Sequence, residues 1–171
     1  MTYLGTFSKV VFPGLRVGWI AAHRDCIARL LAVSRVSWLS GNVLTQAAIS
    51  RFCDDGSYEE HVRRVHRAYR RRMRTMVQSL KASLPANGVE WTEPTGGYTL
   101  LLRLRTRKTL HEARLVEQLR QAGVLVSPGS LYFSKPADTP CFRLSIANLT
   151  EDRIQEGCRR LGRVLQQSVE D

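Results

Sequence analysis

Three features are missing from this sequence of 171 residues, and each absence excludes a class of protein. No stretch approaches about 18 uninterrupted apolar residues, so no membrane span is predicted and no membrane partner is expected. The first apolar stretch is interrupted by Lys9, Pro13 and Arg16 and ends in no small-residue cleavage site. It is a poor signal peptide, which favours a cytoplasmic location. The four cysteines form no Cys-x-x-Cys pair, so we interpret them as reduced and mostly buried thiols.

Acidic residues are scarce as well. Asp and Glu total 15 against 26 Lys and Arg, which gives a formal net charge of +11, and arginine supplies 22 of the 26 cations. Such a charge favours anionic partners, either nucleic acid or small phosphorylated and carboxylated molecules, and does not choose between them. The rest of the composition, with 43% hydrophobic residues, is that of an ordinary globular chain.

The first part of the chain predicts one strand followed by helices. The apolar run at residues 17–22 is typical of a buried strand. Helical patterns follow over residues 24–35, over residues 44–52 and from Ser57 onward. A single strand would leave a sheet edge unpaired. This part of the chain is therefore expected to begin in the middle of a larger domain.

The longest predicted helix runs from Ser57 to a break at residues 85–88. Its apolar side chains recur every three or four residues and form one stripe: Val62, Val65, Tyr69, Met73, Met76 and Leu80. Arginines fill most of its other faces: Arg63, Arg64, Arg67, Arg70, Arg71, Arg72 and Arg74. They could bind nucleic acid or form a solvated or subunit-facing surface. The second interpretation is favoured, because base-stacking aromatic residues are not interleaved with them.

The C-terminal part alternates between the two kinds of element. Strands are predicted at residues 89–91, 98–104, 124–126 and 142–146, and helices at residues 109–122 and 150–168. The order strand–strand–helix–strand–strand–helix is typical of a small α+β lobe.

Lys9 lies in the most informative stretch. The hydroxyls of Thr6 and Ser8 flank it, and Arg16 follows seven residues later, after a Pro-Gly break. Hydroxyls and a guanidinium that converge on one point would hold a phosphate dianion. A partly desolvated lysine beside a second cation would be partly neutral, and a neutral amine can form an imine with a carbonyl. The two hydroxyls could instead bond only to the backbone of the turn.

The segment Gly5-Thr6-Phe7-Ser8-Lys9, followed by Pro13-Gly14-Leu15-Arg16-Val17-Gly18, resembles the cofactor-lysine region of fold-type I pyridoxal-phosphate (PLP) enzymes, the class I/II aminotransferases. The similarity is greatest to the aminoadipate-aminotransferase-like and MocR/GntR-regulator branch. Further similar segments are residues 94–98, 123–129 and 142–147. The resemblance implies an α/β fold with three parts: a C-terminal remnant of the large PLP-binding domain, a long interdomain helix and a small α+β domain, at residues 1–56, 57–85 and 86–171.

The resemblance also implies roles for single residues. Lys9 would carry pyridoxal 5′-phosphate as a Schiff base and move a proton between substrate and cofactor. Thr6, Ser8 and Arg16 would hold the cofactor phosphate. Arg143 would bind the α-carboxylate of the amino acid and 2-oxo acid substrates, and no metal is implied. Lys9, Arg16 and Arg143 could each instead be ordinary surface or strand-flanking residues.

Complete members of this family are much longer, and their upstream part supplies an aspartate for the pyridine nitrogen, a stacking aromatic ring and most of the large-domain sheet. We therefore expect this chain to be the C-terminal portion of a homodimeric aminotransferase and to have little or no transaminase activity alone. A stable, stoichiometric absorbance band of bound cofactor that is lost in Lys9→Ala would contradict this. The alternative is the effector half of a MocR/GntR-type transcriptional regulator, which would bind nucleic acid only through an N-terminal domain outside this chain.

Overall fold

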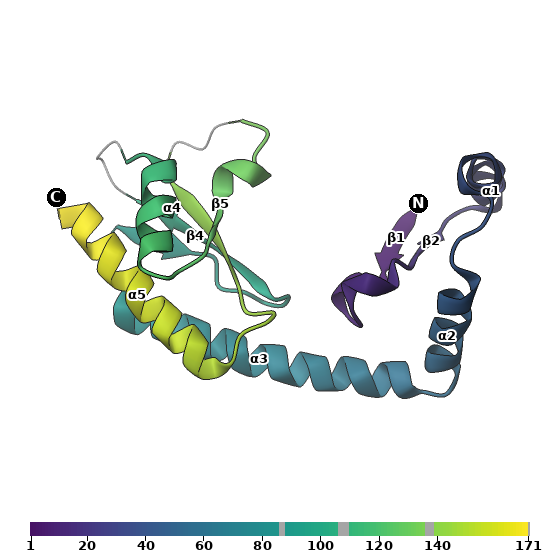
Figure 1. Cartoon of the computed structure of the whole chain (residues 1–171), viewed down its shortest axis with the longest axis horizontal. Helices are drawn as coiled ribbons and strands as arrows, with labels where there is room; N and C mark the ends of the chain where they lie inside the picture. Colours follow the sequence, from purple (N-terminus) through teal and green to yellow (C-terminus); the bar gives the residue numbers. More distant parts are fainter. Residues whose placement is uncertain (86–87, 106–109, 136–138, 171) are drawn as a thin grey trace. The chain divides into compact units, whose positions relative to one another are not determined.

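The computed structural model describes residues 1–85, 88–105, 110–135 and 139–170. The fold is mixed α/β, as predicted, and the chain divides into two compact units, Met1–His66 and Arg67–Asp171 (Figure 1). The division falls inside the long helix α3 (Ser57–Ser83). The predicted three-part division at residues 56 and 85 concerns domains of the family fold and stays a prediction.

The first unit begins with a two-stranded antiparallel hairpin. Strand β1 (Tyr3–Thr6) pairs with β2 (Gly18–Ala21), with Thr6 opposite Gly18. Only the second strand is predicted by the sequence, so the expectation of a single strand is wrong. Gly5 makes the pairing possible, because a Cβ atom there would lie 2.2 Å from the indole ring of Trp19. The expectation that the second strand is buried is also wrong, because all four of its residues are exposed. A hairpin of two strands cannot bury its own faces.

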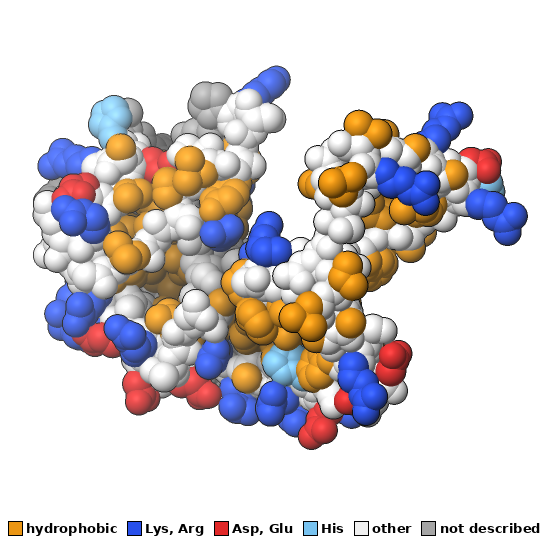
Figure 2. Space-filling view, turned by 45° about the vertical axis from the view of Figure 1, so that its right-hand side comes forward, with side chains coloured by type: hydrophobic (Ala, Val, Ile, Leu, Met, Phe, Trp, Pro, Cys, Tyr) orange, Lys and Arg blue, Asp and Glu red, His pale blue; other side chains and the backbone are white. Residues whose placement is uncertain are grey.

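Two helices and the start of a third complete the first unit. Helix α1 (Arg24–Trp38) runs three residues beyond its predicted end, and α2 (Val43–Asp54) begins after the Asn42 cap, whose Oδ1 accepts a bond from the Thr45 amide at 3.1 Å. Ile49 is the one buried hydrophobic residue among residues 1–66. Many apolar side chains therefore stay at the surface, some of them visible in Figure 2.

The second unit contains a four-stranded antiparallel sheet in the order β3-β4-β6-β5. Strands β3 (Val89–Trp91), β4 (Thr99–Leu104) and β6 (Cys141–Ser145) lie at or within one residue of their predicted positions. The fourth strand, β5 (Ser127–Pro128), does not lie at the predicted residues 124–126. The strand begins later in the sequence than predicted because the Val124 amide donates to the Leu119 carbonyl at 2.8 Å. That bond belongs to the C-terminal end of the preceding helix.

Three helices cover one face of this sheet. The C-terminal part of α3, α4 (Glu112–Gln121) and α5 (Glu151–Glu170) share a single hydrophobic core with β4 and β6. In β6, Phe142 and Leu144 face this core, and Arg143 between them faces the other side. The predicted apolar stripe of α3 is confirmed at its C-terminal end, where Met73, Met76 and Leu80 are buried. Residue 109, the predicted first residue of α4, lies outside the described residues.

One arginine of α3 has a structural role that the sequence pattern does not reveal. Nη1 of Arg72 donates to the carbonyl of Ala147 at 2.8 Å and approaches that of Ile146 at 3.4 Å, so it ties α3 to the chain leaving β6. Arg71 pairs with Glu151 at 3.4 Å. Arg67, Arg70 and Arg74 are exposed, as a solvated face requires. Some arginines of α3 therefore bond to other parts of the second unit, and the others face solvent.

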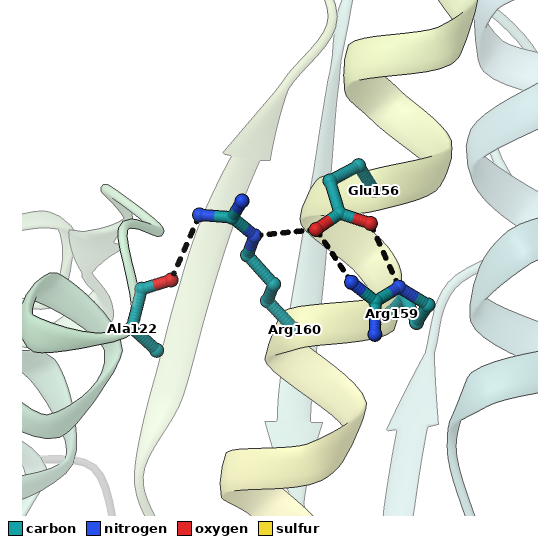
Figure 3. A network of polar contacts seen from close by, with 4 residues as sticks. All are labelled: Ala122, Glu156, Arg159 and Arg160. Carbon is teal, nitrogen blue, oxygen red and sulfur yellow. Dashed lines mark hydrogen bonds and ion pairs between the residues drawn. The ribbon is translucent and has the colours of Figure 1, made fainter.

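A small polar network joins α5 to the end of α4 (Figure 3). Glu156 accepts bonds from Arg159 at 2.6 and 2.7 Å and from Arg160 at 2.6 Å, and Arg160 also donates to the Ala122 carbonyl at 3.2 Å. The two bonds from Arg159, and then the bond from Arg160, lower the pKa of Glu156 from 4.5 to about 2. Because the pKa of Glu156 is lower in the folded state than in the unfolded chain, its ionised carboxylate stabilises the fold above about pH 4.5. This stabilisation is lost as pH falls from about 4.5 toward 2.

The four cysteines are all free, as predicted. Cys141 and Cys158 are buried and the other two are half-buried. Burial raises the pKa of the Cys158 thiol to about 11, which keeps it protonated and unreactive. Within the described residues, no helix is long and apolar enough to cross a membrane.

Candidate functional site

The structure places Thr6, Ser8, Lys9 and Arg16 at one connection, the segment that joins β1 to β2. Thr6 is the last residue of β1, and the 3-10 turn η1 (Phe7–Lys9) follows it directly. A second turn, η2 (Pro13–Leu15), packs against η1 and ends at Arg16. The Phe7 amide donates to the Val17 carbonyl at 3.2 Å and closes the base of the connection. The backbone of the predicted lysine and that of the predicted arginine are thus held on one short closed segment.

Thr6 shapes the turn that carries the lysine. Its Oγ1 accepts a bond from the Ser8 amide at 3.1 Å and donates to the Val17 carbonyl at 3.4 Å. This is the local capping arrangement that a threonine before a helical turn commonly makes. The Ser8 side chain is half-buried and makes no hydrogen bond within the described residues. One of the two predicted hydroxyls therefore has a backbone role, and the other keeps its hydrogen-bonding capacity.

Arg16 adopts a backbone conformation that is rare for a residue with a side chain. Its φ and ψ angles are 52° and 34°, in the left-handed region. That conformation costs a non-glycine residue roughly 1–2 kcal/mol. Strained residues of this kind cluster at functional sites, where the surrounding structure keeps them in place. The guanidinium is exposed and makes no bond to any described residue.

Lys9 ends η1 and is exposed. The expectation that it is partly desolvated is therefore wrong for the described residues, because none of them covers its side chain. Its turn is nevertheless held at the next residue. The Val10 carbonyl lies 2.8 Å from Nε2 of His61, on α3. The sequence does not predict that His61 contributes to this segment.

Arg143 lies in the second unit, on β6, and faces away from the core. The centre of its guanidinium lies 4.5 Å from the ring centre of Tyr132, a cation–π distance. Its Nη2 approaches Oγ of Ser127 at 3.4 Å. Its Nε is buried without a hydrogen-bond partner among the described residues. Arginine carries five N–H donors, so most of this group's capacity is free for an anionic ligand. Neither Tyr132 nor Ser127 was predicted.

Comparisons with known proteins agree with the resemblance that the motifs indicate. The family model for class I and II aminotransferases matches residues 1–161. The 2-aminoadipate transaminase of Thermus thermophilus is 34% identical over 95% of this chain and 40% of its own length. An uncharacterized HTH-type transcriptional regulator, YisV of Bacillus subtilis, is 32% identical over 92% of this chain and 31% of its own length.

A solved structure extends the similarity to the fold. The α-aminoadipate aminotransferase LysN of Thermus thermophilus, complexed with N-(5′-phosphopyridoxyl)-L-leucine, matches with a TM-score of 0.88 and 33% identity. The match covers 97% of this chain and 42% of that one, so this chain spans about two fifths of the length of such relatives. Because the family model covers nearly the whole chain, the chain belongs to the class I and II aminotransferase family.

Proposed function

We propose that this chain supplies the cofactor lysine and the substrate-carboxylate arginine of a pyridoxal 5′-phosphate-dependent aminotransferase that moves an amino group between an amino acid and a 2-oxo acid. One observation carries the proposal: Lys9 and the anion-binding candidates Thr6, Ser8 and Arg16 lie on one closed connection between paired strands. The phosphopyridoxyl ligand of the Thermus structure supports it. Because the chain spans only part of such relatives, the activity and homodimeric state of a whole protein belong to the proposal too.

The residues present fit the phosphate of this cofactor. A phosphate dianion needs hydrogen-bond donors and positive charge, and the Ser8 hydroxyl and Arg16 guanidinium supply both. Neither group is used by another described residue. Thr6 fits less well than the sequence predicts, since its hydroxyl already donates to the Val17 carbonyl. We therefore assign the phosphate mainly to Ser8 and Arg16, with Thr6 shaping the turn.

The chain's own residues would divide the work of the reaction. The cofactor, when bound, supplies a conjugated ring that accepts electrons. Lys9 would hold the cofactor through its Nζ, and the same amine, when free, would accept a proton from the substrate Cα and return it. Arg143 holds the substrate carboxylate through two parallel N–H bonds. Tyr132 covers one face of that guanidinium and limits its rotation.

Reductive trapping tests the assignment of Lys9 without requiring turnover. The chain has four lysines: Lys9, Lys81, Lys108 and Lys135. After incubation with pyridoxal 5′-phosphate and cyanoborohydride, peptide mapping should find Lys9 labelled about tenfold faster than the exposed Lys135. A contribution of about 1.4 kcal/mol from phosphate binding, about that of one hydrogen bond, gives that factor.

Pyridoxal without its phosphate is the matched control, and it should label Lys9 and Lys135 at similar rates. Equal labelling by the phosphorylated compound would contradict the assignment. So would a preference for Lys9 that persists with unphosphorylated pyridoxal, because the phosphate would then have no binding partner.

Arg16→Gly should remove the phosphate preference and leave the hairpin intact. Glycine adopts positive φ at little cost, so the substitution stabilises the folded state by about 1 kcal/mol through the strain it relieves. The greater entropy of glycine in the unfolded chain destabilises the fold by a similar amount, so the two effects roughly cancel. The labelling ratio of Lys9 to Lys135 should therefore approach one while amide exchange in β1 and β2 stays unchanged. Arg16→Ala should lower the ratio equally. A ratio that stays near its original value in both variants would exclude Arg16 from the phosphate site.

A second candidate function has its own support. Because a helix-turn-helix regulator is 32% identical over most of this chain, the same fold could form the effector half of a MocR/GntR-type regulator. The reading frame upstream of the Met1 codon distinguishes the two. A winged-helix segment encoded in frame before the large domain would favour the regulator, and a start at the large domain would favour the enzyme.

A further inference from the structure

His61 lies against the backbone that carries Lys9, although the two are 52 positions apart in the sequence. Its Nε2 is 2.8 Å from the carbonyl oxygen of Val10, the residue that follows the lysine. Its Nδ1 is 3.0 Å from Nη2 of Arg64, one turn further along α3. Both ring nitrogens are thus engaged, and His61 is half-buried.

The two partners determine where the imidazole proton lies. A guanidinium can only donate hydrogen bonds, so Nδ1 must be the acceptor from Arg64. A carbonyl can only accept, so the proton must lie on Nε2 and point to Val10. Arg64 and Val10 therefore favour the same neutral tautomer. In that tautomer His61 donates to the lysine-bearing segment and cannot accept from it.

The other side of the lysine turn is held by aromatic contacts with the same helix. Phe7, the first residue of η1, meets the ring of Tyr58 edge to face at 5.8 Å between centroids. Phe52 of α2 contacts both Tyr58, at 6.2 Å, and the imidazole of His61, at 6.1 Å. Phe7 and Val10 are thus fixed at opposite ends of the turn, with Lys9 between them.

We propose that His61 is a positioning residue for Lys9 and that Arg64 acts through it by fixing its tautomer. The proposal rests on the proposed function of Lys9. Because α3 contacts both ends of the turn, the position of the amine depends mainly on its own side-chain torsions. Fixing a reacting group in this way raises its rate of reaction with a bound partner.

The test compares two histidines on one helix. His61→Leu removes the N–H donor, and His61→Gln keeps an N–H group at nearly the same reach. His66→Leu and His66→Gln are the matched controls, because His66 is exposed and makes no hydrogen bond within the described residues. The readouts are the Lys9-to-Lys135 labelling ratio with pyridoxal 5′-phosphate and the exchange of the Val10 and Val11 amides, which both bond to the Phe7 carbonyl.

We expect His61→Leu to lower the labelling ratio about threefold to tenfold, the equivalent of one hydrogen bond, and to speed exchange of both amides by a similar factor. His61→Gln should restore both readouts to within about twofold of the original, and the His66 variants should change neither. Since Arg64→Met keeps the imidazole and its packing, a reduction in that variant and none in Arg63→Met would assign the effect to the tautomer.

Each other outcome has a definite meaning. Unchanged ratio and exchange in both His61→Leu and Arg64→Met would overturn the proposal. Faster exchange throughout α2 in every His61 variant, with no rescue by glutamine, would also overturn it and show a role in general stability. If the unaltered chain shows no preference for Lys9, the proposed cofactor function is what fails. The exchange of the Val10 and Val11 amides then still decides whether His61 holds the turn.

Discussion

Amide hydrogen exchange of the 171-residue chain is expected to show slow exchange in β4, β6 and the middle of α5 and exchange at least about 1000-fold faster in α1. Exchange protection follows the free energy of the opening that exposes an amide, and that energy depends on buried apolar contacts. All the residues of the large hydrophobic core lie between Met73 and Leu165. Helix α1 has no buried residue, and Val36 and Trp38 are 89% and 72% exposed.

A factor of about 1000 corresponds to about 4 kcal/mol, which is less than the whole unfolding free energy of a typical domain, about 5–15 kcal/mol. The hairpin, α2 and the start of α3 should lie between the two extremes, since Ile49 and the ring contacts of Phe7, Phe52 and Tyr58 give them some packing. Mass spectrometry of exchanged peptides measures all of these segments in one experiment. Protection of α1 equal to that of β6 would show that the first unit is stabilised by contacts absent from this structure.

Phe142→Ala should lower the free energy of unfolding of the second unit by about 3–5 kcal/mol. Phe142 is fully buried at the centre of the sheet, opposite Leu102, in a core closed by three helices. Truncation of a buried phenylalanine loses its transfer free energy and leaves a cavity that the neighbours fill only in part. The loss approaches the whole stability of many domains.

Urea unfolding followed by Trp91 fluorescence measures the effect, because Trp91 packs against this core. The more exposed Trp19 and Trp38 should first be replaced by phenylalanine so that they do not contribute to the signal. Phe133→Ala is the matched control, since Phe133 is 38% exposed, and it should cost less than about 1 kcal/mol. Equal losses in the two variants would show that Phe142 is not at the centre of the core.

The sequence predicts most of the helices and the lysine segment because the signals for both are local. The stripe of α3 recurs within each turn, and the motif around Lys9 and Arg16 lies within one short stretch that folds back on itself. Strand β1 was missed because its four residues include a glycine and carry no alternating pattern. Its partner β2, not its own composition, makes it a strand.

The contacts that could not be predicted join residues far apart in the sequence. Nothing near Val10 indicates His61, and nothing near Arg72 indicates the carbonyl of Ala147. The start of β5 differs from the prediction for another reason. Residues 124–126 have strong strand propensity, but the Val124 amide is hydrogen-bonded to the Leu119 carbonyl at the end of the preceding helix. Long-range hydrogen bonds and the end of a helix both override local preference.

Phe142 and Arg143 are neighbours on β6, and one points into the core while the other points away from it. A deletion of a single residue within this strand, upstream of the pair, would turn every following side chain over. The guanidinium would then enter the apolar core, and the benzyl group would take its place on the face that points away from the core. Loss of folding and loss of the carboxylate binding proposed for Arg143 would therefore occur together. Insertions and deletions of whole residues should be tolerated in the surrounding loops but not within the five residues of β6.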